Sequence, residues 1–113
     1  MIEINIETRE TINVVSLSGE VDATNAALVQ QQVMPLSVPG CKLVMDLSKV
    51  AYMSSAGLRM LLSIYRQTSG KQGRIVLVGL SEELQDTMSM TGFLGYFVVQ
   101  ETLDAALQFV ARD

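Results

Sequence analysis

Two adjacent serines, Ser54 and Ser55, precede a strongly amphipathic segment and are the residues of this sequence with the clearest chemical potential. A serine at the start of a helix can accept hydrogen bonds from backbone N–H groups that lack helical partners. It can also be phosphorylated, because a phosphate there meets free N–H groups and the positive end of the helix dipole. A phosphate would add about −1.5 to −2 charges and could expel a bound protein without unfolding the domain. The residues alone leave both interpretations open.

Two neighbours of the serine pair bear on this choice. Gly57 costs a helix about 1 kcal/mol relative to alanine, so it requires a reason, either close approach of another molecule or tight packing on a sheet. Arg59 lies four residues beyond Ser55 on the same helical face and could contact a phosphate there. The alternative for Arg59 is a solvated side chain without a specific role.

Composition excludes several function classes for this chain of 113 residues. It contains no histidine and one cysteine, Cys41, so Ser-His-Asp and Cys-His catalysis are excluded and the commonest metal ligand is absent. Eight basic residues are scattered among twelve acidic ones, without the cluster that nucleic-acid binding requires. No apolar run of about 18 residues suggests a membrane span. We therefore expect a cytoplasmic binding protein, not an enzyme, with no metal or cofactor.

The hydrophobic pattern predicts one α/β domain over residues 1–113, in the order β-β-α-β-α-β-α-β-α. The first two strands should form a hairpin, with the alternating first strand at a sheet edge. The later units imply a single-layer mixed, mostly parallel sheet with helices packed against it. The predicted strands are 2–7, 12–18, 42–47, 75–78 and 96–99, and the predicted helices are 25–34, 55–69, 82–91 and 103–110.

Functional loops of such a sheet lie beyond the carboxyl ends of its parallel strands. Three predicted loops leave those ends, at residues 19–24, 48–55 and 79–81. We therefore expect Asp22, Asp46 and the serine pair to gather at one rim, although they are distant in the sequence.

The residues at this rim resemble a known family. The stretch from Asp46 to Leu58 is similar to the signature of the STAS domain, in particular that of bacterial anti-sigma factor antagonists. In that family a strand ends in Asp-Leu-Ser, and a loop leads to Asp-Ser-Ser/Thr-Gly-Leu at the head of a helix. The family's Gly-Glu-hydrophobic-Asp loop resembles residues 19–22, and its late Thr-Gly-hydrophobic turn resembles residues 91–93. These matches occur in the right order and cover nearly the whole chain.

The resemblance implies a phosphorylation switch. In the family, the unphosphorylated antagonist binds a serine kinase that is also an anti-sigma factor, which frees the sigma factor; the kinase then phosphorylates the antagonist, and a metal-dependent phosphatase reverses the step. Alignment on Gly57 places the acceptor at Ser55, the family's aspartate at Ser54 and its next Ser/Thr at Ala56. Ser55 is thus the predicted phosphorylation site, with Ser54 as the alternative. The residues predicted to contact a partner are Glu20, Asp22, Met53, Ser54, Gly57, Leu58 and Arg59.

Other interpretations stay open at this point. A STAS scaffold or adaptor subunit of a stress-signalling or lipid-transport complex would bind partners without control by phosphorylation. A nucleotide-binding domain ranks below both, because the chain has no Gly-rich phosphate loop of the Walker or Rossmann kind. The polar outer face of the first strand favours a monomer.

Overall fold

Five strands over residues 2–112, the part of the chain that this computed structural model describes, form one sheet in the order β1-β2-β3-β4-β5. β1 is antiparallel to β2, and the other neighbouring strands are parallel. The elements are β1 (Ile2–Arg9), β2 (Ile12–Val21), α1 (Ala26–Val33), the short 3₁₀ helix η1 (Met34–Leu36), β3 (Lys42–Met53), α2 (Ser55–Gly70), β4 (Arg74–Val78), α3 (Glu82–Met90), the 3₁₀ helix η2 (Leu94–Tyr96), β5 (Val98–Gln100) and α4 (Leu103–Ala111). The predicted fold class and element order are confirmed.

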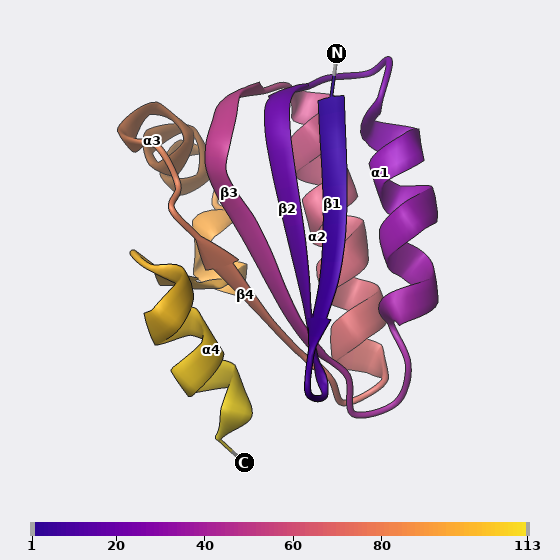
Figure 1. Cartoon of the computed structure of the whole chain (residues 1–113). Coiled ribbons are helices and arrows are strands. Elements are labelled where there is room, and N and C mark those ends of the chain that lie inside the picture. The colour runs from indigo at the N-terminus through magenta and orange to yellow at the C-terminus, as the bar shows by residue number, and fades with distance from the viewer. Residues whose placement is uncertain (1, 113) are drawn as a thin grey trace.

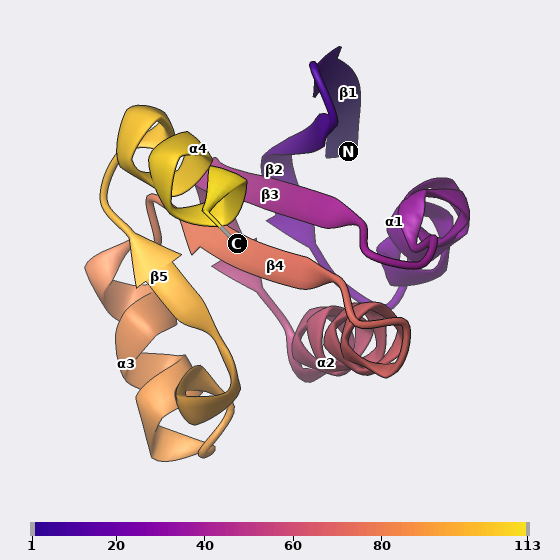
Figure 2. The same ribbon diagram turned by 90° about the horizontal axis from the view of Figure 1, so that it is seen from below.

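Helices cover the two faces of the sheet unequally (Figures 1 and 2). Side chains alternate between the faces of a strand, so β3 contributes to both layers. Leu43, Met45 and Leu47 are buried in a cluster with residues of α1, α2 and α3, whereas Val44 is buried in a second cluster with Ala106 of α4. The larger core therefore lies between the sheet and α1–α3, and α4 covers the other face.

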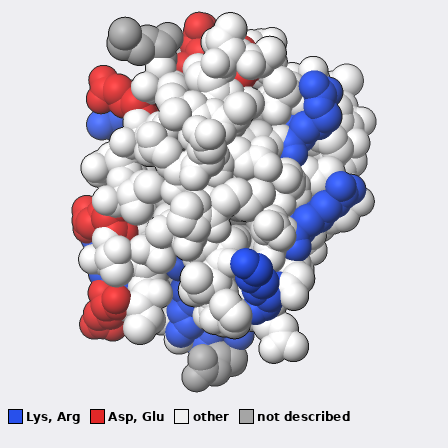
Figure 3. Space-filling model, turned by 90° about the vertical axis from the view of Figure 1, so that its right-hand side faces the viewer, with Lys and Arg blue, Asp and Glu red and all other residues white. Residues whose placement is uncertain are grey.

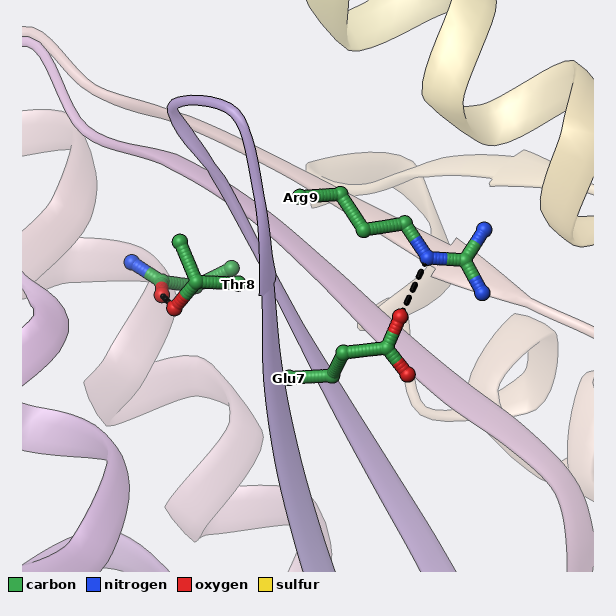
Figure 4. Close-up of polar contacts among 4 residues, drawn as sticks. Glu7, Thr8 and Arg9 are labelled. Carbon is green, nitrogen blue, oxygen red and sulfur yellow. Dashed lines mark hydrogen bonds and ion pairs between the residues drawn. The ribbon is translucent and has the colours of Figure 1, made fainter.

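The β1–β2 hairpin forms as predicted, with β1 at the sheet edge and Ile2 and Arg9 paired with Gly19 and Ile12. Two exposed side-chain hydrogen bonds lie near its turn (Figure 4). Arg9 Nε donates to Glu7 Oε1 at 2.5 Å, and the Thr8 hydroxyl donates to Asn13 Oδ1 at 2.8 Å. An ion pair this exposed contributes at most about 1 kcal/mol, so strand pairing and the apolar inner face hold the hairpin.

Two strands are longer than the pattern predicts. Gly19 does not end β2, and residues 48–53 are not a loop but the second half of β3. The β2–β3 pairing shifts register between Ser16 and Ser18 and again between Gly19 and Glu20. Such bulges absorb extra residues while the strands continue, and Gly19 adopts the positive φ of 117° that glycine tolerates. The two strands therefore run on together to Val21 and Met53.

The last strand is shorter and later than predicted. Residues 94–96 form η2, closed by the Phe97 N–H donating to the Leu94 carbonyl at 3.1 Å, and β5 starts only at Val98. Tyr96 thus lies outside the strand, where its ring contacts that of Tyr65, with a centroid separation of 5.6 Å. Aromatic packing on α2 has overridden the local strand preference here.

Candidate functional site

The ends of β2 and β3 bring two of the predicted regions together. The Ser54 N–H donates to the Val21 carbonyl at 2.8 Å, which joins the start of α2 to the residue just before Asp22. The expected rim of Asp22 and the serine pair therefore exists. It is held by a backbone hydrogen bond that continues the strand ladder.

Asp46 does not belong to this rim, contrary to the prediction. It pairs with Ser16 and Val78 in the middle of the sheet, because β3 continues beyond it to Met53. Its carboxylate accepts hydrogen bonds from the Ser48 N–H at 3.0 Å and the Ser48 hydroxyl at 2.7 Å. Asp46 thus stabilises the irregular part of β3 and lies apart from the serines.

Ser54 is the N-cap residue of α2. Its backbone is extended, with φ −77° and ψ 175°, and its hydroxyl accepts a long hydrogen bond of 3.4 Å from the Gly57 N–H. Serine and aspartate are both preferred at this position, where replacing a capping side chain with alanine costs about 1 kcal/mol. Ser54 therefore caps α2 at a position where an aspartate would also serve as a cap.

Ser55 is the first residue of α2 and its side chain is exposed. The first turn of α2 contains no acidic residue, so no neighbouring carboxylate there offsets the positive end of the helix dipole. Arg59 is exposed one turn further along the same face. A phosphate on Ser55 would therefore meet backbone N–H groups and a nearby cation.

Gly57 is required by packing. A Cβ atom at this position would lie 2.4 Å from Met53 Cγ and 2.9 Å from Val21 Cγ1, both closer than real contacts allow. The absence of a side chain lets the first turn of α2 lie directly on the ends of β2 and β3. Of the two explanations for this glycine, tight packing on the sheet is the one that the structure supplies.

The predicted partner-contacting residues lie at different depths. Glu20 and Arg59 are exposed and Asp22 and Ser54 are partly exposed, whereas the remaining three, Met53, Gly57 and Leu58, are buried. The buried residues fix the height and direction of the α2 start. They shape the surface rather than form its outermost layer.

A hollow of about 310 Å³ lies beside the serine pair, between the start of α2 and helix α3. Met53 and Leu58 are among the residues at its base, and Tyr52, 56% exposed, stands at its margin. Glu83 and Thr87 of α3 form part of the opposite wall. The sequence analysis did not select Tyr52, Glu83 or Thr87. Tertiary packing brings the two α3 residues here, whereas a tyrosine two residues before the serine pair was a usable signal in the sequence.

The loop carrying Asp22 is held by its own polar contacts. The Asp22 carboxylate accepts from the Thr24 hydroxyl at 2.5 Å and from the Thr24 N–H at 2.9 Å, and these bonds lower the pKa of Asp22. Asn25, also missed from sequence, is buried; its Oδ1 accepts from the Asp22 N–H at 3.0 Å, and its Nδ2 donates to the Glu20 carbonyl at 2.9 Å. The loop is therefore preorganised next to Ser54.

Within residues 2–112, no group of three or more histidine, cysteine or carboxylate side chains is placed to hold a metal ion. No helix in the same part of the chain is long and apolar enough to cross a membrane. The rim itself presents hydroxyl groups, an exposed helix start and carboxylates.

Fold and rim together define a small α/β domain with an exposed serine at a helix start. Residues 3–106 match the family model of the STAS domain. The chain belongs to the STAS domain family, as its motifs suggested.

The relatives that match this chain share a regulatory description. The anti-sigma-B factor antagonist of Bacillus subtilis is 30% identical over 91 residues, covering 79% of this chain and 84% of that protein. The anti-sigma-B factor antagonist of Listeria monocytogenes is 33% identical over 93 residues, covering 80% and 82%. The crystal structure of an anti-sigma factor antagonist from Mycobacterium paratuberculosis superposes with a TM-score of 0.88 at 29% identity, covering 99% of this chain and 96% of that one.

Proposed function

We propose that this chain is an anti-sigma factor antagonist that binds an anti-sigma factor in its unphosphorylated form and is released when Ser55 is phosphorylated. The descriptions of its relatives support the first part. The observation that supports release by phosphorylation is that the two serines have different structural roles. Ser54 caps α2, whereas Ser55 is exposed at the first position of the helix.

Ser55 is the better acceptor of the two for a physical reason. Modifying Ser54 would place a phosphate on the oxygen that accepts from the Gly57 N–H and would disturb the helix cap. Modifying Ser55 leaves that cap intact. The phosphate would still lie within the influence of the α2 dipole, where an anion is favoured.

The proposed phosphate acts through charge. Glu20 and Glu83 lie near the rim and the hollow, and Asp22 is held ionised by Thr24, so the surface around Ser55 is already acidic. About two further negative charges would repel an acidic partner surface and would have to be desolvated against an apolar one, and Arg59 offsets part of this charge. The fold need not change for binding to be lost.

The chemistry of the switch belongs to the partners. A serine kinase, which we take to be the anti-sigma factor itself, would transfer the γ-phosphoryl group of ATP to Ser55 Oγ, releasing ADP and the hydroxyl proton. A metal-dependent serine phosphatase would hydrolyse the ester with water and release inorganic phosphate. This chain contributes the hydroxyl group and the surface that both partners recognise, so we propose that it is not itself an enzyme.

The decisive test is phosphorylation by the anti-sigma factor kinase encoded nearest to this chain. With ATP, intact mass should rise by one phosphate in the unmodified protein and in Ser54→Asp, which keeps a capping side chain, but not in Ser55→Ala. Phosphate that persists in Ser55→Ala and disappears in Ser54→Asp would move the site to Ser54. A kinase that binds the chain and never modifies it would favour the adaptor interpretation.

A further inference from the structure

The two edges of the sheet differ in how well they are protected against pairing with another strand. Proteins usually protect an exposed edge by short length, bulges, proline or charged side chains. At one edge, β5 has only three residues. At the other, β1 has eight, contains no proline, and pairs with β2 from Ile2 to Arg9 without a register shift. Charged side chains are therefore the only one of these protections that β1 has.

Backbone groups of alternate β1 residues point away from the sheet. Arg9 and Ile12 pair with each other across a two-residue turn. The closing pair of such a hairpin is hydrogen-bonded, and along an antiparallel ladder these pairs alternate with pairs whose backbone groups point outward. Counting back from the turn, the N–H and C=O groups of Ile4, Ile6 and Thr8 face the outer edge of β1. Within residues 2–112 no strand pairs with this edge.

The side chains of β1 are sorted between the two faces of the sheet. Glu7 pairs with Val14 of the buried cluster beneath α4, so the charged residues of β1, all at odd positions (Glu3, Glu7 and Arg9), share that face. Ile6 lies on the opposite face and is 37% exposed. β1 thus carries both signs of charge, whereas on the side of the molecule seen in Figure 3 most basic side chains gather along one margin, away from the acidic ones.

We propose that the outer edge of β1 pairs with β1 of a second copy of this chain, which joins the two sheets into one. A twofold axis perpendicular to the sheet makes the two strands antiparallel, and outward-facing N–H and C=O groups of one copy then meet those of the other. The residue that lies on the axis faces itself and defines the register. The polar face of β1, which predicts a monomer from the sequence, stays in water because edge pairing covers neither face.

The charges of β1 disfavour three of the registers that keep outward-facing residues opposite one another. With Asn5 on the axis, Glu3 faces Glu7 of the second copy. With Glu7 on the axis, this residue faces itself. Like charges directly opposite one another destabilise a strand pair. With Ile4 on the axis, Glu3 faces Asn5, and Arg9 faces no residue of the other strand.

The register with Ile6 on the axis matches opposite charges. Glu3 then faces Arg9 of the second copy, and symmetry makes this pair occur twice. Arg9 uses Nε for Glu7 of its own chain, and its guanidinium group has further N–H donors for Glu3 of the other. Asn5 faces Glu7, and the two Ile6 side chains meet and cover part of their exposed surface. Charge complementarity therefore selects a second copy in this register.

Sedimentation velocity of the full chain at low salt, over a wide concentration range, tests the association. The unmodified protein should shift from one chain to two. Arg9→Glu should weaken the association by about tenfold, because symmetry sets the new acid against Glu3 twice. Arg66→Glu makes the same charge change at an exposed position of α2 and should leave the association unchanged. A protein that stays monomeric throughout, or equal weakening by both variants, would overturn the proposal.

Charge reversal tests the register. Glu3→Arg alone should also weaken the association, because arginine then faces Arg9 of the other copy. Combining Glu3→Arg with Arg9→Glu restores opposite charges across the axis and should recover most of the lost affinity. Circular dichroism should first confirm that all variants are folded. A double variant that associates no better than the single ones would refute the register centred on Ile6.

Amide hydrogen exchange tests the backbone pairing independently of charge. As the concentration of the unmodified protein rises, exchange should slow at Ile4, Ile6 and Thr8, whose N–H groups face the outer edge of β1. The amide of Val99 is the control, because β5 lies at the opposite edge of the sheet. Association without slower exchange at the three β1 amides would show that the copies meet through another surface.

Discussion

The starts of α2 and α3 are built alike and differ in their charges. Each begins after an extended serine whose hydroxyl accepts from the backbone N–H three residues on, Ser54 from Gly57 at 3.4 Å and Ser81 from Leu84 at 3.1 Å. The first turn of α3 then carries Glu82 and Glu83, whereas that of α2 carries no acid.

This difference identifies which helix start can accept an added anion. Acidic residues in a first turn offset the positive end of the dipole, so α3 is already complemented by its own side chains. Of the three helices in residues 2–112 with side-chain N-caps, α4 likewise has Asp104 in its first turn, and α2 alone has none. A phosphate on Ser55 would supply the charge that α2 lacks.

The largest change in the free energy of unfolding is expected from adding a side chain at Gly57, where the start of α2 packs on the sheet. Gly57→Ala should lower the free energy of unfolding by about 1–3 kcal/mol, because its methyl group overlaps Met53 and Val21. Gly70→Ala is the matched control at the other end of α2, where an added Cβ meets no described atom within 4 Å. Urea denaturation of both variants measures the difference. Equal stability of the two variants would contradict the packing role of Gly57.

Removing each capping side chain tests whether the two N-caps contribute equally to the free energy of unfolding. Ser54→Ala and Ser81→Ala should each cost about 1 kcal/mol, with the smaller loss at Ser54, whose hydrogen bond is longer. Ser54→Asp should restore most of the loss, because aspartate also caps. Chemical denaturation is the measurement, and a destabilised Ser54→Asp protein would show that the residue has another structural role.

Adding an acid to the first turn of α2 and removing one from the first turn of α3 should change the free energy of unfolding in opposite directions. Ser55→Asp adds an acid to the first turn of α2 and should stabilise the protein by about 0.3–1 kcal/mol, while Glu82→Gln removes one from α3 and should destabilise it by a similar amount. Thermal unfolding at low salt measures both. If Ser55→Asp destabilises the fold, a phosphate at Ser55 would disrupt α2, and the charge-repulsion mechanism would need revision.

The smallest expected effect is on the ionisation of Asp22, in the loop beside the start of α2. The Thr24 hydroxyl lowers the pKa of Asp22 below the usual 3.8, so the ionised carboxyl group contributes stability above that pH and loses it as pH falls through the folded value. NMR titration of Asp22 should show this depression and its reduction in Thr24→Ala. An unchanged titration in that variant would assign the depression to the backbone N–H groups.

Local patterns sufficed to predict the element order, the hairpin and the edge strand. Alternation in residues 2–7 and the 3.6-residue period of α2 are properties of neighbouring residues, so no tertiary information was needed. The serine pair at the start of α2 followed from the same patterns.

The second half of β3 could not be predicted in this way. Ser48 and Lys49 interrupt its apolar pattern, and the bulges that accommodate them depend on the partner strand. The position of Asp46 in the middle of β3 therefore could not be predicted without knowing how β3 pairs with β2. Glu83 reaches the neighbourhood of Ser55 only through the packing of α3, which no spacing in the sequence encodes.

The unequal lengths of β3 and β4 have a mechanical consequence. β4 pairs with β3 only as far as Asp46, and beyond this point β3 continues to the start of α2 with β2 as its one paired strand, while β1 pairs with β2 as far as Gly19. Ser55 therefore follows directly on a strand end that is held by the β2–β3 ladder and by the packing of Gly57 (Figure 1). Enzymes place their reactive groups in concave pockets, whereas an exposed side chain on a rigid support can enter the cleft of another protein. Under the proposed function, Ser55 would be presented to a kinase from a rigid helix start and not from a disordered tail.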